Sequence, residues 1–274
     1  NLNLLKYFGS SNRFSHPLPK EWLKIIVNQE IEVSFFYSKI LLFITTLRFL
    51  LVGIYWILRD ILLNLFYFSQ NHKKNVGHAF FMDIEWNCLP NESEENGYNL
   101  ITWYLNWCGR VKSLGEIRHN VERSKLSVDK VDVINADYIP KLKIWGLIKF
   151  MGWSLVAVIL SVIYLILGKW HNVILLKEAA ISMKFQMIEK EFLAREYLFS
   201  ISNHIYRPLW TYVAENRGSK VTMYNYAASF PMLTSFPELG LKTMTWPRIL
   251  QWSKPYANYI RDKLIFKGIE VIDV

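Results

Sequence analysis

Cysteine is scarce in this sequence. Its 274 residues include two cysteines, Cys88 and Cys108. Two cysteines cannot build a disulfide framework, and their spacing matches no zinc or redox motif. The sequence therefore indicates a reducing compartment, and we predict neither a metal site nor a bound cofactor.

Other absences exclude further classes of protein. Lys and Arg number 32 against 23 Asp and Glu, a net charge of +9, but they are scattered and form no patch interleaved with aromatics. This pattern argues against nucleic-acid binding. The first 35 residues carry several charges and no apolar core of a signal peptide, so we expect no cleavable leader in them. No glycine-rich phosphate fingerprint occurs at 202–206, which excludes an ordinary dinucleotide site.

Apolar residues, by contrast, are in excess. They make up 52% of the chain, more than a soluble domain of this length needs for its core. Residues 150–168 are 19 positions without a charge, enough for a helix to reach across roughly 30 Å of hydrocarbon. Trp145, Trp153 and Trp170 lie near the ends of this run, as interfacial anchors do.

A second apolar run, 40–68, is the weaker candidate for a membrane span. It carries Arg48 and the pair Arg59–Asp60, which are costly in the middle of a bilayer. The alternative is that both runs are buried helices of a soluble domain. The uncharged length of 150–168 favours the membrane over this alternative.

The segments on either side of the 150–168 run both carry α/β patterns that need one shared sheet, and a sheet cannot straddle a bilayer. We therefore predict two helices that dip into one leaflet or pack as a hairpin on the membrane face, with Arg48, Arg59 and Lys149 reaching the headgroups. The net positive charge fits an anionic cytoplasmic leaflet. The predicted location is the cytoplasmic face of the inner membrane.

The first α/β pattern reads strand, helix, strand. A β-prone run at 76–86 enters a loop, a short helix is predicted at 98–108, and a second strand leads to residues 118–120. His119 would then lie near a strand end, where α/β ligand sites open. The simpler interpretation of His119 is a surface histidine.

The C-terminal third predicts a compact βαβ unit with parallel strands. Its strands are 197–202 and 221–226, and Ser202 or Asn203 caps a helix from 205 to 217 that Gly218 ends. After a loop at 227–243, the predicted elements are a strand at 248–252, a helix at 256–266 and a strand at 269–274.

These patterns divide the chain into five segments. They are an N-terminal segment (1–39), an apolar helix (40–68), an α/β segment (69–140), a second apolar helix (141–170) and a Rossmann-like α/β segment (171–274). The chain begins without Met and ends in a predicted strand, so we expect both ends to be truncated and the last segment to lead into a further C-terminal domain.

A resemblance to a known family rests on residues 195–274. The motif Arg207-Pro208-Leu209-Trp210-Thr211-Tyr212 is followed by Ala214-Glu215, Arg217-Gly218-Ser219, Tyr224, Trp246-Pro247, Trp252 and the run 268–274. These residues resemble bacterial surface-carbohydrate biosynthesis proteins, glycosyltransferases of the GT-B type distantly similar to Kdo transferases and glycerophosphotransferases.

The resemblance implies a fold and an activity. The fold is α/β, the Rossmann-like N-terminal half of a GT-B enzyme, here with two long apolar, membrane-associated helices. Such enzymes hold the acceptor mainly in the N-terminal domain and the nucleotide-sugar donor mainly in the C-terminal one. The implied partners are a nucleotide-sugar, a glycan or lipid-linked acceptor, and the membrane.

Four residues are the candidate substrate contacts: Ser202, Asn203, His204 and Arg207. They lie between a strand and its helix, where amide N–H groups at a helix start bind phosphate. Sugar transfer needs a base and a cation for the leaving diphosphate, and His204 and Arg207 are the required types. A capping histidine and a surface arginine explain them equally well, so no catalytic residue is assigned. We expect Arg207→Ala to lose transfer activity with little change in thermal stability.

Two other functional classes stay open. A non-catalytic, membrane-attached module of a polysaccharide assembly complex would keep the fold and tolerate loss of His204 and Arg207. A small polytopic membrane protein would have no Rossmann unit, and both apolar runs would cross the membrane.

Overall fold

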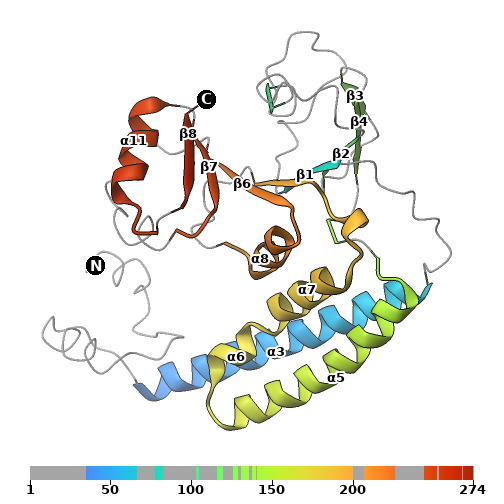
Figure 1. Cartoon of the computed structure of the whole chain (residues 1–274). Helices are drawn as coiled ribbons and strands as arrows, with labels where there is room; N and C mark the ends of the chain where they lie inside the picture. Colours follow the sequence, from blue (N-terminus) through green and yellow to red (C-terminus); the bar gives the residue numbers. More distant parts are fainter. Residues whose placement is uncertain are drawn as a thin grey trace, which may run out of the picture. The chain divides into compact units, whose positions relative to one another are not determined.

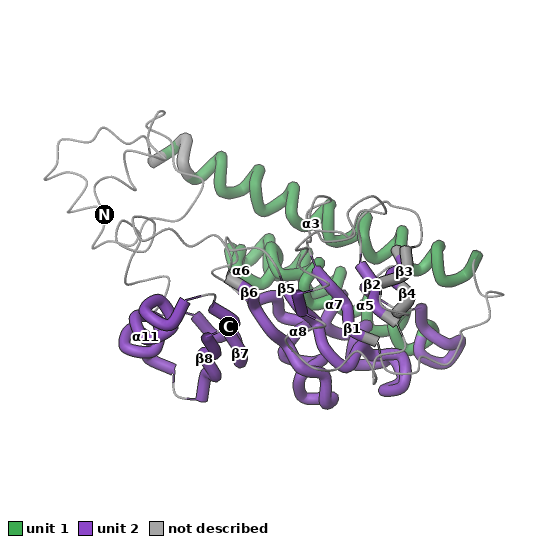
Figure 2. Tube along the Cα trace, turned by 90° about the horizontal axis from the view of Figure 1, so that it is seen from above, with its two compact units in different colours: residues 1–68, 147–180 green, residues 69–146, 181–274 purple. Residues whose placement is uncertain are grey.

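The structure of the protein is a computed structural model. It describes residues 35–66, 78–82, 103–104, 116–119, 126–128, 131–135, 138–139, 141–199, 207–225, 244–251, 253–266 and 268–273. The chain divides into two compact units, residues 1–68 with 147–180 and residues 69–146 with 181–274. Figure 1 labels the helices and strands, and Figure 2 shows unit 1 in green and unit 2 in purple.

Unit 1 is helical throughout its described part. It contains α3 (Phe35–Phe66), nearly all of α5 (Ile144–Ile166), α6 (Trp170–Ile174) and the start of α7 (Leu176–Met187). α3 packs against α6. The two predicted apolar helices are therefore confirmed as helices, α3 starting five residues earlier and α5 six residues earlier than the apolar runs themselves.

Both long helices are apolar on their exposed faces. The stretches Lys39–Phe66 and Ile144–Ile166 have mean hydropathies of 2.1 and 2.0, long and apolar enough to cross a membrane, and only 22% of each most apolar window is buried. Phe43, Tyr55 and Leu155, for example, are more than half exposed. A core helix of a soluble domain buries its apolar face. In this structure most of the apolar surface of both helices is exposed.

The buried stripes of the same helices mix large apolar residues with small and polar ones. They are Thr46, Leu50, Gly53, Ile57 and Asn64 in α3, and Leu147, Phe150, Ser154 and Ser161 in α5. Thr46 donates to the Leu42 carbonyl and Asn64 to the Asp60 carbonyl, so both side chains find acceptors within the helix. Four polar side chains are thus buried, while most of the exposed side chains of the two helices are large and apolar, together with the exposed cations Arg48, Arg59 and Lys149.

Unit 2 is built on one sheet. Its described strands are β1 (His78–Met82), β2 (Glu116–His119), β3 (Leu126–Val128), β4 (Val131–Asn135), β5 (Glu196–Phe199), β6 (Lys220–Asn225), β7 (Arg248–Gln251) and β8 (Glu270–Asp273). The order is β3-β4-β2-β1-β5-β6-β7-β8. Seven strands are parallel, and β3 pairs with β4 antiparallel at one edge. The predicted α/β class and the shared sheet are both confirmed.

The predicted βαβ unit is confirmed in outline. β5 and β6 are parallel neighbours joined through α8 (Leu209–Asn216). Gly218 has φ +98° and ends α8, with the Gly218 and Ser219 N–H groups donating to the carbonyls of Glu215 and Ala214. This is the Schellman arrangement that a glycine in the left-handed region allows.

The predicted start of that helix is wrong. We expected a helix from residue 205 capped by Ser202 or Asn203, but α8 begins at Leu209 with extended Pro208 as its N-cap. Proline disfavours helical geometry in the residue before it, and Arg207 is accordingly non-helical. Residues 202–206 themselves lie outside the described residues.

Aromatic side chains form much of the unit 2 core. Trp210 of α8 stacks on Phe185 at 4.5 Å between ring centres and meets Tyr197 edge-on at 5.0 Å. Phe199 links this cluster to the fully buried Trp246. α8 is thereby fixed against β5.

The last three predicted elements are also confirmed. The strand predicted at 248–252 is β7, the helix predicted at 256–266 is α11 (Lys254–Lys263), and the final strand is β8. The helix predicted at 98–108 lies outside the described residues except for 103–104, which are helical.

Candidate functional site

The strand order reverses beside the middle of the sheet. The chain starts at β1, adds β2 and β4 on one side, then returns to add β5, β6, β7 and β8 on the other. Met82 and Phe199, the last residues of β1 and β5, are register partners. In open parallel sheets, ligands bind beyond the carboxyl ends of the strands at such a reversal. The carboxyl ends of β1 and β5 are therefore the candidate site.

Three of the predicted contacts belong to the segment that follows this point. Ser202, Asn203 and His204 come within five residues of Phe199, the end of β5, but lie outside the described residues. The topology puts the start of their segment at the reversal, and their role as substrate contacts stays a prediction.

Arg207, the fourth predicted contact, is described in detail. Its side chain is 3% exposed, and Nε donates to the Thr211 hydroxyl at 2.8 Å. The two terminal nitrogens donate to Glu215 at 2.5 Å and to the carbonyls of Thr211 (3.1 Å) and Thr245 (3.3 Å). The guanidinium also stacks on Tyr212, 3.9 Å from the ring centre. These contacts use most of the five N–H groups of a guanidinium, and they tie the start of α8 to the segment before β7.

Polar residues end several other strands at the carboxyl edge. Asn135 and His119 are register partners at the ends of β4 and β2. Asn225, Gln251 and Asp273 are aligned across β6, β7 and β8. Among the strand-end residues whose side chains the structure describes, His119, Gln251 and Asp273 provide an imidazole, an amide and a carboxylate at the ends of β2, β7 and β8. Such groups can hydrogen-bond to the hydroxyl groups of a sugar.

His119 is fully buried, with 0% of its surface exposed. The simpler interpretation of it as a surface histidine is therefore wrong, and its predicted place at a strand end is confirmed. It ends β2 beside Phe81 of β1, one strand from the reversal.

Gln251 was not singled out from the sequence. Its side chain is fully buried, yet neither amide atom has a hydrogen-bond partner among the described residues. A buried amide without partners is costly and is rare in native structures. The available signal was a polar residue closing the apolar strand Arg248-Ile-Leu-Gln251 at the carboxyl edge.

A second polar cluster lies at the opposite, amino edge of the sheet. Glu196, the first residue of β5, is 3% exposed in its side chain. It accepts hydrogen bonds from Tyr104, from Thr222 at 2.6 Å and from Arg248 at 3.3 Å. Because ligands bind at the other edge, we assign this cluster to stability.

Burial and hydrogen bonds shift several pKa values in unit 2. Burial raises the pKa of Tyr197, whose hydroxyl accepts a hydrogen bond from the Ala194 N–H. Burial also lowers the pKa of Arg217. The backbone N–H of Asp273 and the guanidinium of Arg261 stabilise the Asp273 carboxylate and lower its pKa. None of these shifts creates a base at the β1–β5 reversal.

Among the described residues, no group of three His, Cys, Asp or Glu side chains is placed to hold a metal ion. This finding concerns the described part of the chain alone.

One family model matches the chain. Residues 153–272 match the family described as "Polysaccharide biosynthesis PFTS motif protein". The match supports a protein of polysaccharide biosynthesis, and it covers β5, α8, β6, β7 and most of β8. Its description names no reaction, donor or acceptor. No curated protein and no solved structure matches the chain.

Proposed function

We propose that this chain is part of a membrane-attached glycosyltransferase of surface polysaccharide biosynthesis. It would transfer a sugar from a nucleotide-sugar donor to a glycan or lipid-linked acceptor. The observation that carries the proposal is the polysaccharide biosynthesis match over the half of the sheet that begins at the β1–β5 reversal.

The strand order supports a Rossmann-like unit of the GT-B type. Without the antiparallel β3, the order β4-β2-β1-β5-β6-β7-β8 is that of a doubly wound sheet, with one reversal beside the first strand. Such sheets bind nucleotides and sugars at the reversal. A protein made of membrane helices alone would not contain this sheet.

At that position the proposed roles follow the chemistry of sugar transfer. His204 would accept the proton of the acceptor hydroxyl, and Ser202 and Asn203 would hydrogen-bond to sugar hydroxyls or phosphate. Arg207 would contribute positive charge to the leaving diphosphate while remaining bound to α8. His119 closes the neighbouring strand of the same edge.

Membrane attachment is supported by the exposed apolar surfaces of α3 and α5. Large apolar side chains face outward, and Thr46, Asn64, Ser154 and Ser161 are buried. Trp145 is 73% exposed at the start of α5, as an interfacial anchor would be. A lipid environment stabilises such a surface, whereas water does not.

The sheet restricts how α5 meets the membrane. β1, β2 and β4 precede α5, β5 follows it, and all belong to one sheet. If α5 crossed the bilayer, the chain would have to cross again before β5. The helices available there, α6 and α7, have 5 and 12 residues. At about 1.5 Å per residue neither spans roughly 30 Å, so α5 is proposed to dip into the cytoplasmic leaflet.

The proposed activity is tested in the producing cell. Deletion of the gene should abolish a surface polysaccharide, and the wild-type protein should restore it. His204→Ala should lower the rate of polymer synthesis by about 100-fold or more, as loss of a general base does. His171→Ala, in α6 of unit 1, is the matched control and should restore synthesis fully.

The outcome for His204 separates the proposal from its alternative. A non-catalytic module of an assembly complex would keep polymer synthesis with His204→Ala at normal protein level. That result would reject the catalytic role while leaving polysaccharide biosynthesis in place.

A further inference from the structure

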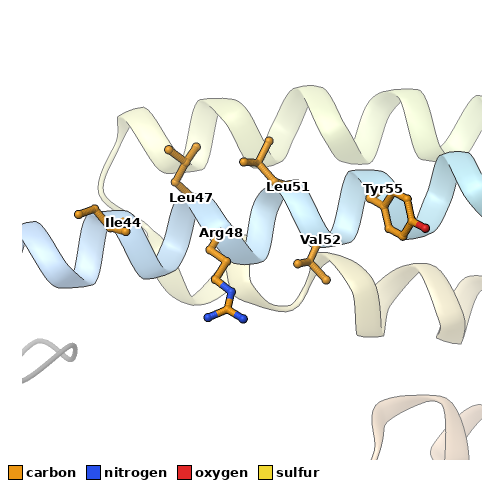
Figure 3. A pocket seen from close by; sticks show the side chains of 6 residues that line it. All are labelled: Ile44, Leu47, Arg48, Leu51, Val52 and Tyr55. Carbon is orange, nitrogen blue, oxygen red and sulfur yellow. The ribbon is translucent and has the colours of Figure 1, made fainter.

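α3 carries a hollow on its exposed surface. The hollow has a volume of about 450 Å³ and is lined by Ile44, Leu47, Arg48, Leu51, Val52 and Tyr55. Figure 3 shows Leu47 and Leu51 projecting to one side of the helix and Arg48 and Val52 to the other. One cation thus borders a lining that is otherwise apolar except for the Tyr55 hydroxyl.

Arg48 lies on the outermost stripe of α3. Tyr55 and Arg59 follow it by 7 and 11 residues, about two and three helical turns, so the three share one face. Buried Leu50 and Ile57 lie about half a turn round the helix from this face. The stripe therefore lies on the side of α3 opposite its buried residues.

This arrangement suits a helix lying along a membrane surface. In a crossing helix Arg48, which is 13 residues from Phe35 and 18 from Phe66, would lie roughly 20 Å from one end and 27 Å from the other, near the costly midplane. In a helix lying in the interface, the whole axis stays close to the headgroups. Arg48 and Arg59 can then both bend their long side chains back to the headgroups, while the flanking leucines reach the acyl chains.

The charge of Arg48 has no counterpart in the described protein. No hydrogen bond or ion pair joins Arg48 to another described residue. The acidic residue of α3 is Asp60, next to Arg59 and three turns from Arg48, against three basic residues in the helix. A guanidinium beside apolar surface is best matched by a phosphate that carries acyl chains.

We infer that the hollow around Arg48 binds one anionic phospholipid, with the phosphate on the guanidinium and an acyl chain along Leu47, Leu51 and Val52. The inference rests on the membrane attachment proposed above and adds to it a defined lipid site. Arg48 is then a ligand-binding residue, and Arg59 contributes general attraction to the surface.

The test uses the full chain purified in detergent, mixed with phosphatidylglycerol or phosphatidylcholine and examined by native mass spectrometry. Wild type should retain one phosphatidylglycerol in preference to phosphatidylcholine. Arg48→Gln should weaken this retention by about tenfold, the cost of one charge-assisted contact. Arg59→Gln, the matched control on the same stripe, should change it by about twofold or less.

If Arg48→Gln and Arg59→Gln weaken phosphatidylglycerol retention equally, the lipid site is overturned, because the lipid is then attracted by positive charge in general and not by Arg48. The lipid site would also be overturned if the wild type forms a dimer without bound lipid and Arg48→Gln is a monomer, because a second copy of the chain would then occupy the hollow. Flotation with vesicles containing about a third phosphatidylglycerol tests the underlying attachment separately. Failure of wild type to float rejects the attachment and the site together, whereas flotation with equal Arg48 and Arg59 effects rejects the site alone.

Discussion

The guanidinium of Arg207 donates a hydrogen bond to the carboxylate of Glu215 at 2.5 Å, along the side of α8. The arginine is almost fully buried, and Glu215 is 39% exposed. Thr211, one turn before Glu215, accepts from the same guanidinium through its hydroxyl and its carbonyl. Arg207 therefore stabilises α8, whatever it contributes to a ligand.

This finding changes the expected result for Arg207→Ala. Loss of a buried, multiply bonded guanidinium should lower the free energy of unfolding by about 2–4 kcal/mol, in addition to any loss of activity. Urea unfolding of the purified protein measures it. Lys143→Ala removes the exposed Lys143–Glu189 pair and should cost at most about 1 kcal/mol. Equal values for both variants would show that the buried contacts do not contribute.

Glu196 and Glu270 offer a second matched comparison. Both carboxylates lie 3.3 Å from Arg248, but Glu196 is 3% exposed and Glu270 is 61% exposed. Glu196→Ala leaves buried donors without an acceptor and should cost about 3 kcal/mol or more. Glu270→Ala should cost at most about 1 kcal/mol. Thermal unfolding compares the two, and a ranking in the opposite order would contradict the proposed stabilising role of the amino-edge cluster.

Gly53 allows the close approach of α3 to the start of α7. A Cβ at position 53 would lie 3.0 Å from Leu176 side-chain atoms, whereas a Cβ at Gly152 of α5 would meet nothing within 4 Å. Gly53→Leu should therefore lower stability by about 1–3 kcal/mol, and Gly152→Leu should not. Thermal unfolding in detergent measures both. Leu176→Ala should restore part of the loss in Gly53→Leu, and no such coupling is expected for Gly152→Leu.

The buried side chain of Tyr197 should make the free energy of unfolding decrease at alkaline pH. Burial raises its pKa above the ordinary value of 10.0, so the folded protein keeps a proton that the unfolded chain releases. The contribution of protonated Tyr197 to the free energy of unfolding is fully present below about pH 10. It falls as the pH rises above this value, by up to about 1.4 kcal/mol per pH unit. Urea unfolding between neutral and alkaline pH measures this slope. Tyr197→Phe should reduce the slope, and an unchanged slope would assign it to other groups.

The sequence was sufficient for the elements whose patterns are local. Apolar length predicted α3 and α5, and β-prone runs bounded by turn residues predicted β1, β2 and β5 to β8. Gly218 marked the end of α8 because the left-handed conformation there favours glycine. The shared sheet was predicted because both α/β segments are short and were expected to contribute their strands to one sheet.

Other elements were missed or misplaced. β3 and β4 were not predicted, because three to five residues between polar segments give little periodicity, although Val131-Asp-Val-Ile alternates. The start of α8 was set four residues too early, because the effect of Pro208 was given less weight than the capping residues before it.

The site was predictable only in part. In the sequence, a predicted strand followed by a predicted helix start pointed to residues 202–207. The strand order puts the end of β5, a few residues before them, at the reversal. The engagement of Arg207 with Glu215 and Thr245 depends on tertiary contacts, which the sequence does not encode locally. The same holds for the burial of His119 and Gln251.

The arrangement of one sheet on one side of the membrane is tested most directly by cysteine labelling. Lys143, before α5, and Asp262, in α11, are both exposed. The test uses a background in which Cys88 and Cys108 are replaced by serine. Lys143→Cys and Asp262→Cys should both react with an impermeant maleimide in inverted inner-membrane vesicles. Neither should react in intact spheroplasts. Labelling of the two positions from opposite sides would contradict peripheral attachment of α5 and the one-sided α/β unit.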